Sequence, residues 1–141
     1  AGAAADPSCR NQRSLEKRTR KKKEAGARFL QTQMVMDKKY LIEFCEQISR
    51  PLEIPVIAGV FLLKSYKNAL FINKYVPGAD IPESILNRLK DAKDPLKEGI
   101  LIAAEQASDF IKIAEGIHIM AVKSEHVIPE ILQIANISLE Y

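Results

Sequence analysis

One stretch decides the fold of this chain: Glu24-Ala25-Gly26-Ala27-Arg28-Phe29-Leu30-Gln31-Thr32-Gln33. It predicts the end of a charged helix, a tight turn and then a short buried strand. Gly26 is expected to take the left-handed conformation after the helix, which lets the chain reverse its direction. Phe29 and Leu30 are expected to enter the core, and the polar pair Thr32-Gln33 follows where the strand ends.

The end of this strand is a candidate ligand site. In a parallel α/β sheet, loops and helix N-termini converge at the carboxyl ends of the strands, and ligands bind there. The carboxamide of Gln33 can donate and accept hydrogen bonds at once, which suits a heterocycle with both kinds of edge. The residues alone indicate a site and do not identify its ligand.

Buried strands are predicted near residues 1–5, 28–33, 55–60 and 117–122, with amphipathic helices between them. Alternation of this kind implies a parallel sheet with right-handed crossovers. Four such units are half of an eight-stranded barrel. An open doubly wound sheet is the alternative that the pattern leaves open.

Two helices between these strands have clear start signals. Asp37 is expected to cap a helix whose apolar stripe places Cys45 in the core, which argues against a nucleophilic role for this cysteine. The other members of that stripe are Leu41, Phe44 and Ile48. Asp94-Pro95 is expected to start a longer helix. Its inward residues are expected to be Leu96, Ile100, Ala103, Ala104, Ala107 and Ile111.

Composition indicates a soluble globular protein with a single domain over residues 1–141. Apolar residues make up 47% of the chain, charged residues 28%, and the formal net charge is +3. No apolar run approaches the ~20 residues of a membrane span, and no signal peptide opens the sequence, so no membrane partner is expected. The first residue is Ala rather than Met, which leads us to expect that the sequence begins inside a longer gene product.

The two cysteines indicate the redox setting. Cys9 and Cys45 lie far apart and form no CxxC motif, which argues against both a disulfide framework and a zinc site. No metal is therefore expected, and a reducing cytoplasm is the expected location.

A basic cluster covers the helix predicted near residues 15–25. A solvated helix face is the preferred interpretation, and contact with phosphate, nucleic acid or an acidic surface is the alternative. No aromatic residues lie between the charges as stacking platforms, so nucleic acid is not the expected partner. The cluster consists of Lys17, Arg18, Arg20, Lys21, Lys22 and Lys23.

Several segments, taken in order, carry a family resemblance. They are Ala3-Ala4-Ala5-Asp6-Pro7, Lys21-Lys22-Lys23-Glu24-Ala25-Gly26-Ala27, Gln31-Thr32-Gln33 followed by Asp37, Pro55-Val56-Ile57-Ala58-Gly59-Val60 and Gly116-Ile117-His118-Ile119-Met120. This ordered set resembles the C-terminal half of methylenetetrahydrofolate reductases. Residues 76–82 and 94–100 resemble the branch of that family found in archaea and acetogenic bacteria.

The resemblance implies an α/β fold, namely the C-terminal half of a (β/α)8 TIM barrel, with about four parallel strands and the helices outside. It also implies the family's reaction, in which a reduced flavin converts 5,10-methylenetetrahydrofolate to 5-methyltetrahydrofolate by hydride transfer. FAD is the implied cofactor, with FMN as the alternative, and NAD(P)H or another donor supplies the electrons. The substrate is a folate, and the setting is one-carbon metabolism and methionine biosynthesis.

The resemblance also assigns roles to individual residues. Gln33 and Asn68 fall on folate-contacting positions, while Lys22 and Asp6 fall on positions near the flavin. The family's acid for protonating the folate is a glutamate on the first strand of the absent N-terminal half. The catalytic residue is therefore unknown for this chain.

Three positions depart from the family pattern. Leu15 replaces an acidic flavin contact, with Glu16 adjacent, and Leu62 replaces a common proline. Ser124 stands where many members have an arginine that contacts folate.

Three interpretations follow. We prefer a fragment or split subunit of a folate reductase that is inactive alone and pairs with the missing barrel half or forms a homo-oligomer. The second is a folate- or corrinoid-linked methyltransferase barrel without flavin. The third is a non-catalytic interaction module whose basic helix meets an acidic partner.

Overall fold

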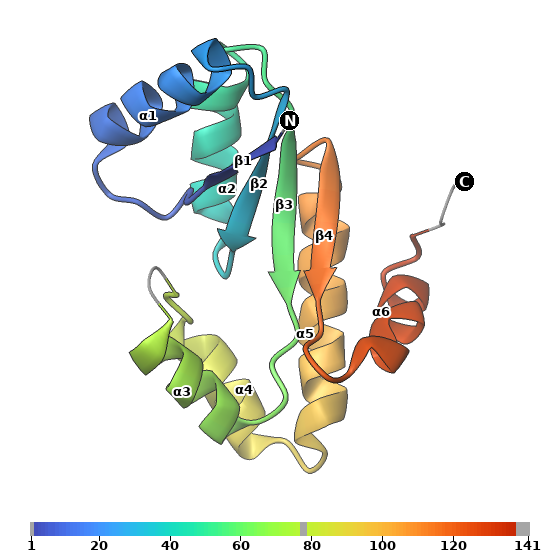
Figure 1. Ribbon diagram of the computed structural model, residues 1–141. Coiled ribbons are helices and arrows are strands. Elements are labelled where there is room, and N and C mark those ends of the chain that lie inside the picture. Colours follow the sequence, from blue (N-terminus) through green and yellow to red (C-terminus); the bar gives the residue numbers. More distant parts are fainter. Residues whose placement is uncertain (1, 77–78, 138–141) are drawn as a thin grey trace.

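The computed structural model describes residues 2–76 and 79–137, which form a parallel sheet with helices packed along one face (Figure 1). The strands are β1 (Gly2–Ala5), β2 (Phe29–Met34), β3 (Val56–Phe61) and β4 (Gly116–Met120). The helices are α1 (Gln12–Glu24), α2 (Lys38–Phe44), α3 (Tyr66–Tyr75), α4 (Glu83–Asp91), α5 (Pro95–Phe110) and α6 (Ile128–Ile134). A π-helical segment, Cys45–Ser49, continues α2, and a 3-10 turn, Glu125–Val127, precedes α6. Of the segment 76–82, Pro77 and Gly78 lie outside the described residues.

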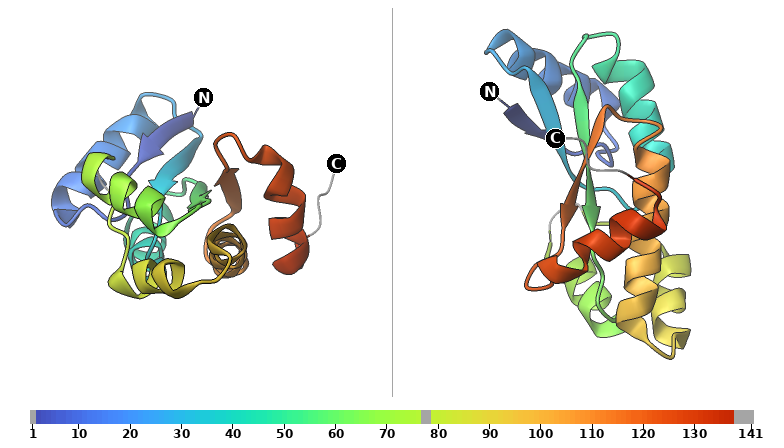
Figure 2. Two further views of the ribbon diagram at one scale, coloured as in Figure 1. Left: turned by 90° about the horizontal axis from the view of Figure 1, so that it is seen from below. Right: turned by 90° about the vertical axis from the view of Figure 1, so that its right-hand side faces the viewer.

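The strand order distinguishes between the two architectures that the alternation left open. The four strands lie side by side in chain order, and every neighbouring pair is parallel. A doubly wound sheet would reverse its strand order and carry helices on both faces. Here α1, α2, α5 and α6 all lie along the convex face of the curved sheet (Figure 2). This is the arrangement of half an eight-stranded barrel, so the predicted architecture is confirmed.

The turn between α1 and β2 has the predicted geometry. Gly26 has a φ of 105°, in the left-handed region, directly after the C-cap residue Ala25. The N–H of Gly26 donates to the carbonyl of Lys23 (3.0 Å), and the N–H of Ala27 donates to that of Lys22 (3.0 Å). This pair of hydrogen bonds satisfies the last carbonyls of α1 and turns the chain into β2.

Two clusters of buried side chains hold the helices in place. The larger cluster packs the convex face of the sheet against α1, α2, α5 and α6. The smaller one lies beyond the carboxyl ends of the strands, where α3 packs against α4 and α4 packs against α5 (Figure 1). The smaller cluster contains Met36, Leu63, Ala69, Ile72, Ile81, Leu89 and Ile102.

Side chains along each strand alternate between the face that the helices cover and the opposite face, which is open. On β2, Leu30 and Thr32 are 0% and 4% exposed beneath the helices, whereas Gln31 and Gln33 are exposed on the opposite, concave face. Within residues 2–76 and 79–137, no helix lies along this concave face (Figure 2). The open face is therefore available to whatever completes or occupies the half barrel.

The helix after β2 confirms its predicted cap and stripe. The carboxylate of Asp37 accepts a hydrogen bond from the N–H of Lys39 (3.0 Å), and all four stripe residues are buried. Cys45 is 1% exposed, and this burial is the main reason that the pKa of its thiol lies above the usual value. A raised pKa keeps the thiol protonated, which fits a core residue rather than a nucleophile.

Two predicted core positions of α5 are wrong. Asp94 caps the helix with Pro95 in its first turn, as predicted. However, Leu96 is 37% exposed because the first turn of α5 extends beyond the strand ends (Figure 1). Ile111 is 41% exposed because the helix ends at Phe110, which is 1% exposed and occupies the core at that turn.

The register between β2 and β3 shifts at one buried side chain. Leu30 aligns with Val56, but Met34 aligns with Gly59, so β2 carries an extra residue between these pairs. The hydroxyl of Thr32 accepts a hydrogen bond from the N–H of Gly59 (2.8 Å) and donates one to the carbonyl of Gln33 (2.7 Å). Thr32 thus bridges the irregularity that sets the backbone position of Gln33.

This bridge requires a glycine at position 59. A Cβ at Gly59 would lie 2.9 Å from the carbonyl oxygen of Gln33 and 3.0 Å from that of Thr32. Both are backbone atoms of β2, so they can give way only if the two strands move apart.

We therefore expect Gly59→Ala to lower the free energy of unfolding by about 1–3 kcal/mol, the usual cost of overpacking a buried site. Gly116→Ala is the matched control, because a Cβ at this second strand glycine would meet its nearest atom only at 3.8 Å. Urea titrations of both variants and the parent measure the difference. Equal losses for the two variants would show that the close approach at Gly59 has no energetic weight.

Candidate functional site

The concave face of the sheet carries a hollow of about 580 Å³. Its lining residues come from all four strands and from the residue that follows α3. Through Met34, Phe61 and Met120 it reaches the carboxyl ends of β2, β3 and β4. The complete lining is Gly2, Ala3, Ala4, Phe29, Gln31, Thr32, Gln33, Met34, Phe61, Val76 and Met120.

The wall of the hollow is apolar with two amides on it. Gly2 and Ala4 of β1 leave its floor shallow, and the ring of Phe29 lies so close to Gly2 that a Cβ there would come within 2.4 Å of it. Gln31 and Gln33 project from the same face of β2, because side chains two residues apart on a strand share a face. A flat ring could lie against such a wall with its polar edge toward the amides.

Gln33 is the one predicted site residue in the lining of this hollow. It is exposed, and its backbone carbonyl is held by the Thr32 hydroxyl. The carboxamide is therefore accessible on a backbone that is fixed in position.

Asn68 lies elsewhere, in the first turn of α3. Its side-chain oxygen accepts a hydrogen bond from the N–H of Lys64 (3.1 Å), and its own N–H donates to the hydroxyl of Ser65 (3.0 Å). Asn68 is half-buried and is not in the lining of the hollow. In this structure its amide orders the loop between β3 and α3.

Lys22 and Asp6 both lie beside β1, an edge strand of the sheet. The ammonium of Lys22 donates to the backbone carbonyl of Ala4, which is a lining residue of the hollow. The carboxylate of Asp6 follows the end of β1 and accepts hydrogen bonds from the N–H (3.1 Å) and the hydroxyl (2.6 Å) of Ser8. Neither residue itself lines the hollow, but Lys22 reaches its β1 wall.

Phe29, expected in the core, forms a wall of the hollow instead. The other lining residues that the sequence did not indicate include Gln31, Met34, Phe61, Val76 and Met120. Gln31 could have been found, because it stands two residues before Gln33 and must share its face in a strand. Phe61 and Met120 could not, since their place depends on how far β3 and β4 extend.

Neither a metal-binding cluster nor a membrane-spanning helix is present among the described residues. No three His, Cys, Asp or Glu side chains among them gather in a way that could hold a metal ion. In the same part of the chain, no helix is long and apolar enough to cross a bilayer.

Solved structures include one with the same architecture, an uncharacterised protein from Clostridium thermocellum described as binding two copies of 5-methyl-5,6,7,8-tetrahydrofolic acid. The two superpose with a TM-score of 0.66 at 20% sequence identity, over 95% of this chain and 51% of that one. The chain thus spans about half the length of this neighbour.

Comparison with families of known proteins gives a match over nearly the whole chain. Residues 3–136 match the family described as methylenetetrahydrofolate reductase. No curated protein matches the chain. Because the family match covers far more than half of the sequence, this chain belongs to the methylenetetrahydrofolate reductase family.

Proposed function

We propose that the chain is part of a flavin-dependent methylenetetrahydrofolate reductase and that its concave face supplies the pterin-binding wall of the active site. The observation that carries this proposal is the pair of exposed amides, Gln31 and Gln33, on an apolar hollow that runs along the concave face and reaches the carboxyl edge of the parallel strands. This is the edge at which ligands bind in barrels.

The hollow suits a pterin for two reasons. A pterin is a flat heterocycle, and the Phe61, Phe29 and Met120 side chains offer apolar surface against which it could stack. Its edge carries both N–H donors and ring-nitrogen or carbonyl acceptors, which a carboxamide can pair simultaneously. The description of the Clostridium thermocellum protein as binding a methylated tetrahydrofolate supports the same ligand class.

Asn68 is proposed to contact folate through the amide nitrogen, because its oxygen already accepts from Lys64. Such a contact would bring the N-terminus of α3 toward the ligand. Its capping residue Ser65 holds Asn68 in place through the hydroxyl.

The residues beside β1 fit a flavin. Small side chains on β1 leave room for a ring system, and the Lys22 ammonium, now on the carbonyl of Ala4, is a cation that can bond an anionic or carbonyl group of the cofactor. Asp6 would accept from a hydroxyl or N–H group of the cofactor. FAD is the proposed cofactor, reduced by NAD(P)H or another donor.

The chemistry divides between the cofactor and the protein. A bound reduced flavin would supply the hydride for the 5-methyl group. The bond from the methylene carbon to N10 would break, with its electron pair going to N10. N10 must then gain a proton from an acid. We assign that acid to the missing half of the barrel, so this chain's residues bind and orient the folate and do not donate the proton.

Two other functions remain as alternatives, and two measurements separate them from the reductase: flavin absorbance and the salt dependence of binding to an acidic partner. A folate- or corrinoid-linked methyltransferase would bind folate but no flavin. An interaction module would bind an acidic partner through the basic face of α1, and salt would weaken that binding. A yellow protein with flavin absorbance after purification supports the reductase. A protein that binds folate but shows no flavin absorbance supports the methyltransferase.

A cytoplasmic location fits Cys9 and Cys45, which form no disulfide.

If the other half of the barrel is missing, the oligomeric state of this chain can be predicted. β1 and β4 are both edge strands, and the concave face between them is uncovered. We expect the 141-residue chain alone to dimerise or aggregate, and to become soluble and defined in mass when an N-terminal half barrel of the family is supplied. Light scattering after size-exclusion chromatography gives the mass. A compact monomer of high thermal stability would contradict the prediction.

Gln33 gives the sharper prediction. If its amide pairs with a pterin edge, each bond left unmade costs ~1–3 kcal/mol, so Gln33→Ala should weaken folate binding roughly ten- to a hundredfold. Gln33→Glu keeps the size but replaces the NH2 donor with an oxygen, so it should also weaken binding wherever that donor is used. Flavin content should change little, because Lys22 and Asp6 are assigned to the cofactor.

Folate is titrated into the complete reductase, or into this chain complemented by the missing half. Flavin absorbance is monitored during the titration. Gln133→Ala is the matched control, since Gln133 is an exposed glutamine on the distant helix α6. Equal folate affinity in parent, Gln33→Ala and Gln33→Glu would remove Gln33 from the site. Loss of flavin in Gln33→Ala would show that its role belongs to the cofactor instead.

A further inference from the structure

A second cavity of about 570 Å³ lies away from the concave face, on the helix layer, where α4 and α5 meet the start of α2. None of its described lining residues is shared with the hollow on the concave face. Its inner wall is formed by Met36, Ile102, Gln106 and Phe110, all of which are at most 9% exposed. We call this cavity the outer cleft.

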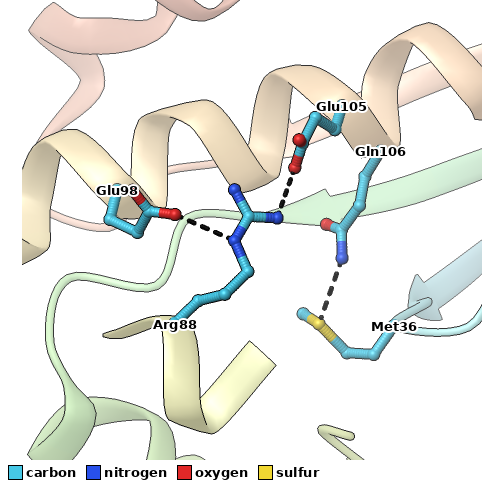
Figure 3. Close-up of polar contacts among 5 residues, drawn as sticks. All are labelled: Met36, Arg88, Glu98, Glu105 and Gln106. Carbon is cyan, nitrogen blue, oxygen red and sulfur yellow. Dashed lines mark hydrogen bonds and ion pairs between the residues drawn. The ribbon is translucent and has the colours of Figure 1, made fainter. Parts of the chain in front are cut away.

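One polar side chain in the outer cleft is buried without full pairing. Gln106 is only 8% exposed, and its Nε2 donates to the thioether sulfur of Met36 at 3.4 Å (Figure 3). Among the described residues, its Oε1 has no hydrogen-bond partner. A thioether is a weak acceptor, so Gln106 offers one unused acceptor and one donor that a better acceptor could take over. Buried amides are normally paired, and the described protein groups supply no partner for this oxygen of Gln106.

The charged side chains that line the outer cleft are each paired within the protein, and the carboxylate of Asp37 lies 4.0 Å from the ammonium of Lys39. Arg88 bonds Glu98 (2.8 Å) and Glu105 (2.6 Å), as Figure 3 shows. The Nζ of Lys38 lies 3.8 Å from Oδ2 of Asp109. The bond to Glu105 is the main reason that the pKa of Arg88 lies above its usual value, so this guanidinium stays charged and paired. A ligand therefore needs no net charge of its own to enter.

We propose that the outer cleft binds a small neutral molecule that carries an amide group on an aromatic ring. The ligand N–H donates to Gln106 Oε1, and its carbonyl accepts from Gln106 Nε2 in place of the Met36 sulfur. The ring packs against Met36, Ile102 and Phe110, where apolar area and the polarisable sulfur favour it. This proposal is independent of the folate site.

Methionine methyl groups can test this proposal. The sequence has three methionines, of which Met36 lines the outer cleft, while Met34 and Met120 line the hollow on the concave face. In the chain labelled with methyl-13C methionine, we expect benzamide to shift the Met36 signal in a saturable manner and to leave that of Met120 in place. Self-association through the concave face would leave the outer cleft open, and where the chain alone aggregates, the titration uses the labelled chain paired with an N-terminal half barrel of the family.

Two comparisons isolate the hydrogen bonds. N,N-dimethylbenzamide lacks the N–H donors and should bind at least tenfold more weakly than benzamide to the unchanged protein. Gln106→Met should weaken benzamide at least tenfold, while Gln133→Met on the exposed face of α6 should leave its affinity unchanged. A Met36 signal that benzamide does not move, or that both compounds move equally, overturns the proposal. A Met36 signal that benzamide does not move would mean that the cleft holds water only. A shift of the Met120 signal alone would place the benzamide on the concave face.

Discussion

The hydroxyl of Thr32 joins β2 to β3 at the point where their register shifts. It accepts from Gly59 and donates to the carbonyl of Gln33, so a single buried oxygen satisfies a backbone N–H that the irregular ladder would otherwise leave unpaired. The two strands approach so closely there that position 59 has no room for a side chain. The placement of Gln33 on the concave face depends on this contact, because a slip of one residue would exchange the two faces of β2.

Burial on one face alone explains where function can reside. The helices bury the convex side of all four strands, and the polar residues of β2 that could not be buried there project from the concave side. In a closed barrel that side is normally filled by side chains from every strand. Here β1 contributes only glycine and alanine, so a shallow apolar surface with Gln31 and Gln33 on it remains open on the concave side.

Local rules predicted most of the fold, and tertiary geometry determined what they missed. Gly26 and Asp37 were predictable because turn and cap chemistry depends on a few adjacent residues. Ile111 was misplaced because periodicity does not report where a helix stops. At the site, Gln33 lies in the hollow, and its role stays a prediction, as do the roles of Asn68, Lys22 and Asp6. All three already bond nearby protein groups, a use of polar side chains that sequence spacing does not reveal.

The glutamine side chains of the two cavities differ in solvent exposure and in hydrogen bonding. Gln33 is exposed, so water satisfies its carboxamide until a ligand replaces that water, and the free protein is not destabilised by keeping it. Gln106 is buried against a thioether, so its unpaired oxygen lowers the stability of the fold in the absence of a ligand. An apolar residue of the same size would fill that position on α5 without this cost. A ligand that pairs both groups of the Gln106 carboxamide would remove this cost, which packing within the described residues does not.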